Sequence, residues 1–166
     1  MEITDIRVFL EYWENIRQRT VRVAQVIPRE RIEWTHQPGK FTFGDILRHL
    51  AGIERYMYAE NAQCKPSRYP GHGREIAEGY DAVFEYLERL HRESTEIFAR
   101  LTQEDLQKRC TLPSGTTIPV WKWLRAMVEH EVHHRGQIYL SLGILGVKTP
   151  PLYGLTSEEV RERSVP

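Results

Sequence analysis

The pair of histidines at positions 130 and 134 is the part of this sequence best suited to chemistry. Residues four apart lie about one turn apart on the same face of an α-helix, so His130 and His134 can bind one divalent metal ion together. His49 lies far upstream, in another amphipathic segment. If the two helices pack side by side, three neutral imidazoles converge and leave one position on the metal open. An open three-ligand site is typical of a metal that takes part in a reaction.

The histidine pair can be explained either by a shared metal ion or by ordinary hydrogen bonds to the protein. An isolated H-x-x-x-H pair also arises by chance in helices, where each ring bonds to protein groups. His49 favours a metal, because buried imidazoles need polar partners and one shared ion would serve all three rings. His133 lies about 100° round the helix from His134 and is not predicted as a ligand.

The neighbours of the three histidines can orient the rings. A metal-bound histidine normally donates its second ring N–H to a carboxylate, carbonyl or water. Asp45 and Tyr56 are candidates for this role beside His49. Gln137 follows His134 by three residues; it either bonds a ligand or a metal-bound water, or is a solvated glutamine near the helix end.

Residues 130–134 also match H-E-x-x-H, the zinc-protease pattern, with Glu131 as the general base. The longer form of that motif has glycine at the position of Gln137. The chain also lacks a strand pattern that would supply an edge to hold a peptide. Because five-residue motifs match often by chance, a zinc hydrolase is the weaker alternative.

The apolar residues recur at helical spacing in four long segments. The sequence predicts helices at about 4–27, 43–64, 74–100 and 119–142, a short tail helix at 157–163, and almost no sheet. Thr42 is the predicted N-cap of the second helix, with Asp45 completing a capping box, and Thr117 is the predicted N-cap of the fourth. Residues 1–166 are predicted to form a single domain, an all-α four-helix bundle with long crossover connections.

Composition excludes several classes of protein. The formal net charge is zero, with 23 basic and 23 acidic residues, so no large basic surface for nucleic acid is expected. The sequence has no apolar run long enough to span a membrane, so neither a membrane span nor a secretory signal is expected. Two cysteines without motif spacing suit a reducing compartment, and a cytoplasmic location is expected.

The motifs around these histidines resemble those of the DinB/YfiT-like superfamily of bacterial metal-binding bundles. Residues 130–138, HEVHHRGQI, are similar to the family's H-x-x-H-H-R-G-Q-[IL] ending. Residues 44–50, GDILRHL, are similar to its second-helix histidine before leucine, and residues 32–43 resemble its lead-in to that helix. The resemblance covers essentially the whole chain.

The resemblance implies a bundle with up-down-down-up helix order and a divalent metal, zinc or nickel, on His49, His130 and His134. It also implies a homodimer. Characterised relatives include thiol S-transferases and a thiol-dependent maleylpyruvate isomerase, in which the metal activates a low-molecular-weight thiol. No other residue matches a family catalytic position, so catalytic and cofactor-binding residues are not assigned.

Two functions therefore remain open. The first is a metal-dependent enzyme, thiol S-transferase-like, that brings together a small-molecule thiol and an electrophile. A bound divalent ion lowers the pKa of a thiol or water, giving a nucleophile at neutral pH. The second is a metal-binding bundle without catalysis, either a sensor or an evolutionary remnant.

Overall fold

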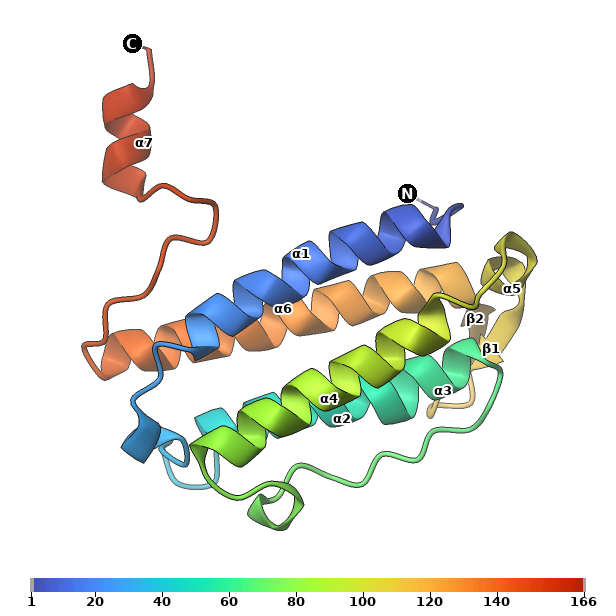
Figure 1. The fold of residues 1–166 in the computed structure, drawn as a ribbon, viewed down its shortest axis with the longest axis horizontal. Helices are drawn as coiled ribbons and strands as arrows, with labels where there is room; N and C mark the ends of the chain where they lie inside the picture. Colours follow the sequence, from blue (N-terminus) through green and yellow to red (C-terminus); the bar gives the residue numbers. More distant parts are fainter. Residues whose placement is uncertain (1, 166) are drawn as a thin grey trace.

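A computed structural model describes residues 2–165, and its main body is a bundle of four long helices (Figure 1). The long helices are α1 (Ile6–Ala24), α2 (Phe43–Ile53), α4 (Tyr80–Phe98) and α6 (Val120–Ile144). α2 continues without a break through η2 (Glu54–Tyr58) into α3 (Ala59–Ala62). The minor elements are the 3₁₀ turns η1 (Arg29–Arg31) and η3 (Arg74–Ile76), the helices α5 (Gln103–Gln107) and α7 (Ser157–Arg163), and the strands β1 (Arg109–Thr111) and β2 (Thr117–Pro119).

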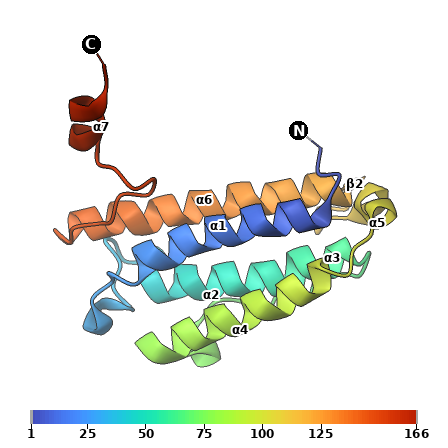
Figure 2. The same cartoon turned by 45° about the horizontal axis from the view of Figure 1, so that its top comes forward.

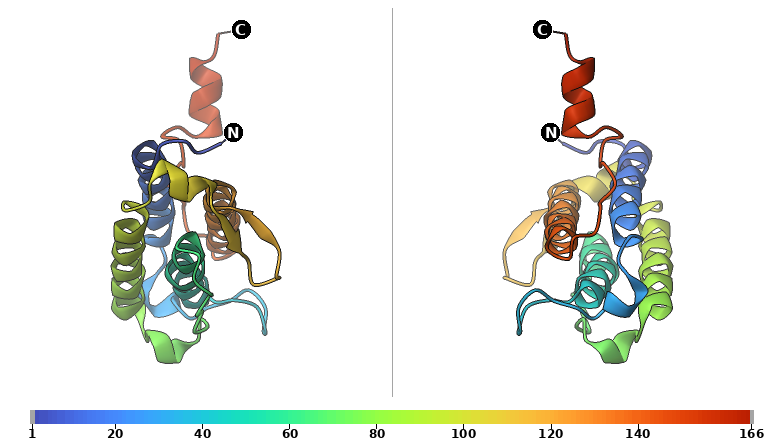
Figure 3. Two further views of the ribbon diagram at one scale, coloured as in Figure 1. Left: turned by 90° about the vertical axis from the view of Figure 1, so that its right-hand side faces the viewer. Right: turned by 90° about the vertical axis from the view of Figure 1, so that its left-hand side faces the viewer.

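The helices are arranged up-down-down-up, as the family resemblance implied. α1 and α6 run in one direction, while α2 and α4 run in the other (Figure 1). Viewed end-on, the four helices occupy the corners of the bundle (Figure 3). α2 packs mainly against α4 and α1 against α6, and α2 also contacts α6. Residues 63–79 return along the length of the bundle to connect the parallel helices α2 and α4, which is the predicted crossover.

Local sequence explains where the helices begin. The predicted capping box is confirmed, because the Thr42 side chain accepts from the Asp45 backbone N–H and Asp45 accepts from that of Thr42. The predicted N-cap at Thr117 is wrong: Thr117 lies in β2 and pairs with Thr111, and α6 begins after Pro119. The strand pairing holds Thr117 in an extended conformation, so the N-cap is Pro119, two residues later, and the helix starts at Val120.

The connections contain more structure than the sequence indicated. α4 begins at Tyr80 rather than near residue 74. It follows Gly79, which has a φ of 84°, a conformation that glycine adopts more readily than other residues. The segment between the third and fourth predicted helices is also structured. It forms α5, which starts with a capping box at Thr102, and then the β1–β2 hairpin.

The segment η2 is a π-turn. The backbone N–H of Ala59 donates to the carbonyl of Glu54, five residues earlier. Such turns insert one extra residue into an α-helix and occur frequently at functional sites. Here the turn follows His49 by one helical turn and a half, and it leaves Glu54 buried in the bundle.

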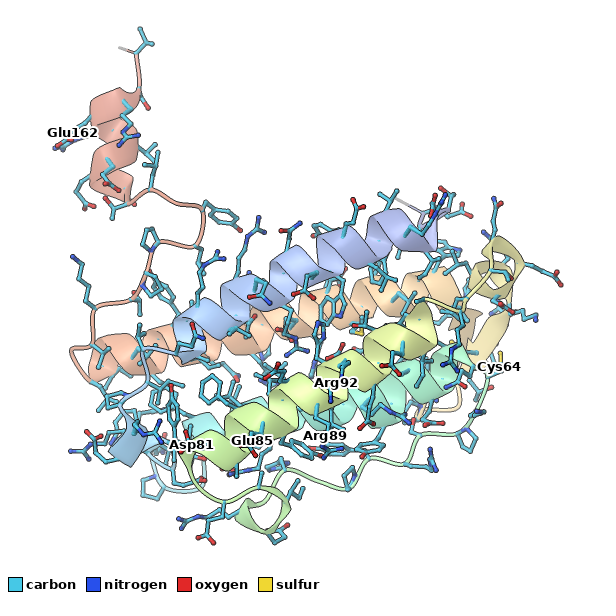
Figure 4. The ribbon with its side chains drawn as sticks, viewed as in Figure 1. Cys64, Asp81, Glu85, Arg89, Arg92 and Glu162 are labelled. Carbon is cyan, nitrogen blue, oxygen red and sulfur yellow. The ribbon has the colours of Figure 1, made fainter. Side chains whose placement is uncertain are left out.

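The core is apolar at both ends and charged in the middle. One cluster surrounds Trp13 near the hairpin, and the other surrounds Leu47 and Leu90 at the opposite end. Each of the four helices also contributes an ionisable side chain to one buried network, whose members are Arg17 from α1, Glu54 from η2, His91 from α4 and Glu131 from α6. The outer face of α4 carries exposed charged side chains, among them Glu85, Arg89 and Arg92 (Figure 4).

The C-terminal segment leaves the bundle. After α6 the chain turns away, and α7 stands apart from the four long helices (Figure 2). None of its residues is buried. In the described part of the chain, no helix is long and apolar enough to cross a membrane.

Candidate metal centre

The structure brings the three predicted ligands together. His49 on α2 faces His130 and His134 on α6, and a ligand nitrogen from each ring lies within 4.8 Å of the other two. The Nε2 atoms of His49 and His130 are 3.0 Å apart. Four nitrogens placed tetrahedrally around a zinc ion would be about 3.3 Å apart, given Zn–N bonds of about 2.0–2.1 Å. The three side chains can therefore hold a divalent metal ion.

Hydrogen bonds to the second ring nitrogens orient two of these rings. His134 Nδ1 lies 2.8 Å from Gln137 Oε1, and His49 Nδ1 lies 2.8 Å from the Tyr69 hydroxyl. The Tyr69 hydroxyl lies 3.0 Å from His72 Nδ1. If each ligand histidine donates its Nδ1–H to these oxygens and Tyr69 donates to His72, both Nε2 lone pairs are free to coordinate.

These contacts test the residues predicted beside the ligands. The prediction for Gln137 is confirmed in its first form, since it bonds His134, one of the predicted ligands. Asp45 and Tyr56 were the wrong partners for His49. Asp45 instead accepts from the Thr42 backbone N–H and from the Arg48 guanidinium.

Tyr69 could not be found from helical spacing. It lies in the crossover segment 63–79, whose path depends on tertiary packing. The only local signal is an aromatic residue among prolines and glycines. Gly52 accommodates it, because a Cβ built at Gly52 would lie only 3.1 Å from the Tyr69 ring.

Burial and electrostatics keep the three candidate ligands neutral. Burial and then the neighbouring histidines lower the pKa of His49 to about 3, and the same effects lower that of His130 to about 4. Burial also lowers the pKa of His134. Only a neutral imidazole can coordinate a metal, so the rings are in the binding-competent state at neutral pH.

The other residues of the motif lie elsewhere. His133 is exposed, and its Nε2 is 3.1 Å from the Gln137 amide nitrogen. Glu131 is only 1 % exposed and forms an ion pair of 3.4 Å with Arg17 inside the bundle. A carboxylate held there is not available as a general base at the histidines, which removes the basis for the H-E-x-x-H hydrolase reading.

A cavity of about 510 Å³ opens beside His134. His134 and Gln137 form part of its wall, and Phe41 covers the site from the loop before α2. The Phe41 ring lies 6.3 Å from that of His134, 5.6 Å from that of His49 and 4.3 Å from that of His72, measured between centroids. A small molecule in this cavity would therefore contact one of the ligand histidines.

Two solved structures have the same fold. A DinB-like protein from Bacillus cereus superposes with a TM-score of 0.71 at 19 % identity, over 89 % of this chain and 97 % of that protein. A DinB-like protein from Bacillus subtilis gives 0.70 at 16 % identity, over 86 % and 96 %. The comparison with curated proteins found no match. The family model of the DinB superfamily matches residues 12–138, a span that contains all three histidines, and the chain therefore belongs to the DinB superfamily.

Proposed function

We propose that this protein is a divalent-metal-dependent enzyme that transfers a low-molecular-weight thiol to an electrophile. His49, His130 and His134 would hold the metal, zinc or nickel. The observation that carries the proposal is the convergence of three neutral imidazoles beside a cavity large enough for a small molecule. A bound divalent ion supplies the positive charge that lowers the pKa of a thiol or water in its open position.

The surrounding side chains prepare the site for this role. Gln137 Oε1 and the Tyr69 hydroxyl would accept from the Nδ1–H groups of His134 and His49, which directs the Nε2 atoms of these rings toward the shared point. The Phe41 ring packs near the rings of His49 and His134 and supplies an apolar wall beside them. Three neutral ligands leave the charge of the ion uncompensated, which favours an anionic partner such as a thiolate.

The proposed reaction is a substitution or addition at carbon. The thiol loses its proton to solvent, and its sulfur forms a bond to the electrophilic carbon. With monobromobimane as the electrophile, the C–S bond forms while the C–Br bond breaks and bromide leaves with the bonding electrons.

The test is metal analysis of the purified protein, followed by conjugation of a panel of low-molecular-weight thiols to monobromobimane and to epoxides. We expect about one divalent ion per chain and conjugation above the uncatalysed rate. His130→Ala should lose both, while the matched control His133→Ala should keep both. Full metal content without conjugation of any thiol would favour the non-catalytic alternative, a sensor or remnant. Absence of metal would overturn both functions.

We also propose a homodimer. The outer surfaces of α1 and α6 expose large apolar side chains that a monomer gains nothing by presenting to water. On α1 these are Val8 and Tyr12, and on α6 they are Val132 and Ile144. A second copy of the chain would cover part of this surface.

A further inference from the structure

We propose that the cavity beside His134 selects small carboxylates with an apolar body, and that Lys40 at its rim binds the carboxylate. The inference rests on the proposed function for the identity of the reacting partner, but the binding specificity can be tested separately. The cavity lies between α6 and the loop that precedes α2. It is lined by His36, Gly39, Lys40, Phe41, Ile46, His134, Gln137, Leu140 and Ser141.

The body of the cavity is apolar. Ile46 is buried in the bundle, whereas Phe41 is 37 % and Leu140 is 67 % exposed although both are large and apolar. These two residues come from different parts of the chain and line the same hollow. Apolar side chains left in water around a cavity are typical of a ligand site, and about 510 Å³ lies in the usual range for small molecules.

The charge of the cavity is positive. None of the residues that line it is acidic, and Lys40 is the one permanently charged residue among them. Lys40 is exposed and, among the described residues, forms no ion pair. A lysine placed in this way is free to bind an anion that enters the cavity.

The acidic residues nearest in sequence are engaged elsewhere. Glu33 accepts two hydrogen bonds from the buried Arg48 guanidinium, at 2.8 and 2.9 Å, and Asp45 accepts one at 2.8 Å. Arg48 thus holds the two carboxylates that flank the loop in sequence. The charge of Lys40 is left for a ligand, and a carboxylate on an apolar body complements both the lysine and the walls of the cavity.

The experiment compares 4-phenylbutyrate with its neutral amide, 4-phenylbutyramide, by isothermal titration calorimetry at low salt. Both the protein as purified and the metal-free protein are titrated. The wild type should bind the carboxylate roughly two- to fivefold more tightly than the amide, which is the range that an exposed ion pair provides. This preference should shrink in high salt, because exposed charges are screened.

Variants assign the preference to a residue. Lys40→Met keeps the length and apolar stem of the side chain, and it should bind the two compounds equally. Lys122→Met, at an exposed lysine on α6 that does not line the cavity, should keep the wild-type preference. Phe41→Ala should weaken the binding of both compounds.

The outcomes separate this inference from the proposed enzyme. If the wild type does not distinguish the two compounds, or if Lys40→Met still prefers the carboxylate, the inference is wrong. A preference that disappears in the metal-free protein also overturns it, because the ion and not Lys40 would then attract the carboxylate. A preference that persists in a protein without thiol conjugation supports the cavity assignment and counts only against the enzyme.

Discussion

The buried ion network makes Arg17 the side chain whose loss should destabilise the fold most clearly. Arg17, Glu54 and Glu131 are each about 2 % exposed, and Arg17 forms ion pairs with both carboxylates. Removing one partner of a buried ion pair costs about 3–5 kcal/mol, because the remaining charge loses its partner without regaining water. Folded domains are stable by only about 5–15 kcal/mol, so this is a large part of the total.

The structure places the expected cost of Arg17→Met near the lower limit, about 3 kcal/mol. Glu54 would keep two donors, Trp13 Nε1 at 3.0 Å and His91 Nδ1 at 2.9 Å. Burial raises the pKa of Glu131, although Arg17 acts in the opposite direction. Without Arg17 this carboxyl would therefore take up a proton rather than remain charged.

Urea unfolding at pH 7 measures this cost. With a slope of roughly 2 kcal/mol per molar urea, the midpoint of Arg17→Met should fall by about 1.5 M. Arg22→Met, at an exposed arginine on the same helix, should change the unfolding free energy by less than about 0.5 kcal/mol. Glu131→Gln added to Arg17→Met should recover part of the loss. A loss below about 1 kcal/mol would refute the electrostatic reasoning, and no recovery in the double variant would assign the loss to packing.

Four further predictions concern the candidate metal site, the buried ion network and the assembly. His130→Ala should abolish metal binding in dialysed protein and His133→Ala should not, as measured by elemental analysis; the opposite result would refute the ligand assignment. Tyr69→Phe should lower metal affinity roughly 10–100-fold in a chelator competition while leaving the helical circular dichroism unchanged; an unchanged affinity would show that the hydroxyl does not orient its histidine. Burial opposes charging of His91, but the neighbouring carboxylates of Glu54 and Glu14 raise its pKa in the folded protein. The charged His91 therefore stabilises the fold below pH 6.5, and this stabilisation is lost as the pH rises through the folded pKa. The difference in unfolding free energy between wild type and His91→Gln should therefore shrink between pH 6.5 and 9, and a difference that grows would contradict the pairing. Sedimentation should give about twice the 19.6 kDa of one chain, and Tyr12→Glu should shift the protein toward monomer; a wild type that is monomeric at micromolar concentration would exclude the dimer.

The sequence was sufficient for features that depend on helical periodicity. The spacing of His130 and His134 guarantees a shared face on any regular helix, and the apolar stripe containing His49 directs that residue inward. The capping box at Thr42 is equally local, since its two hydrogen bonds span three residues. Such features require no knowledge of how distant segments pack.

The features that were missed depend on tertiary structure. Tyr69 reaches His49 only because the crossover segment runs back along the bundle. Thr117 has good capping chemistry, but strand pairing with Thr111 determines its conformation. Arg17 and Glu54 are charged residues, which an apolar pattern assigns to the surface, yet they pair with each other in the core.

The π-turn at η2 also carries an evolutionary consequence. Each residue advances an α-helix by about 100°, so every side chain after Glu54–Tyr58 lies about that angle from where a regular α-helix counted from His49 would place it. A one-codon deletion inside the turn would restore a regular α-helix and leave α3 facing its present neighbours, because the wider π-turn absorbs the extra residue. Relatives with a regular α-helix here should therefore align with a single-residue gap. Positions after that gap should be compared with a shift of one residue when they are counted from His49.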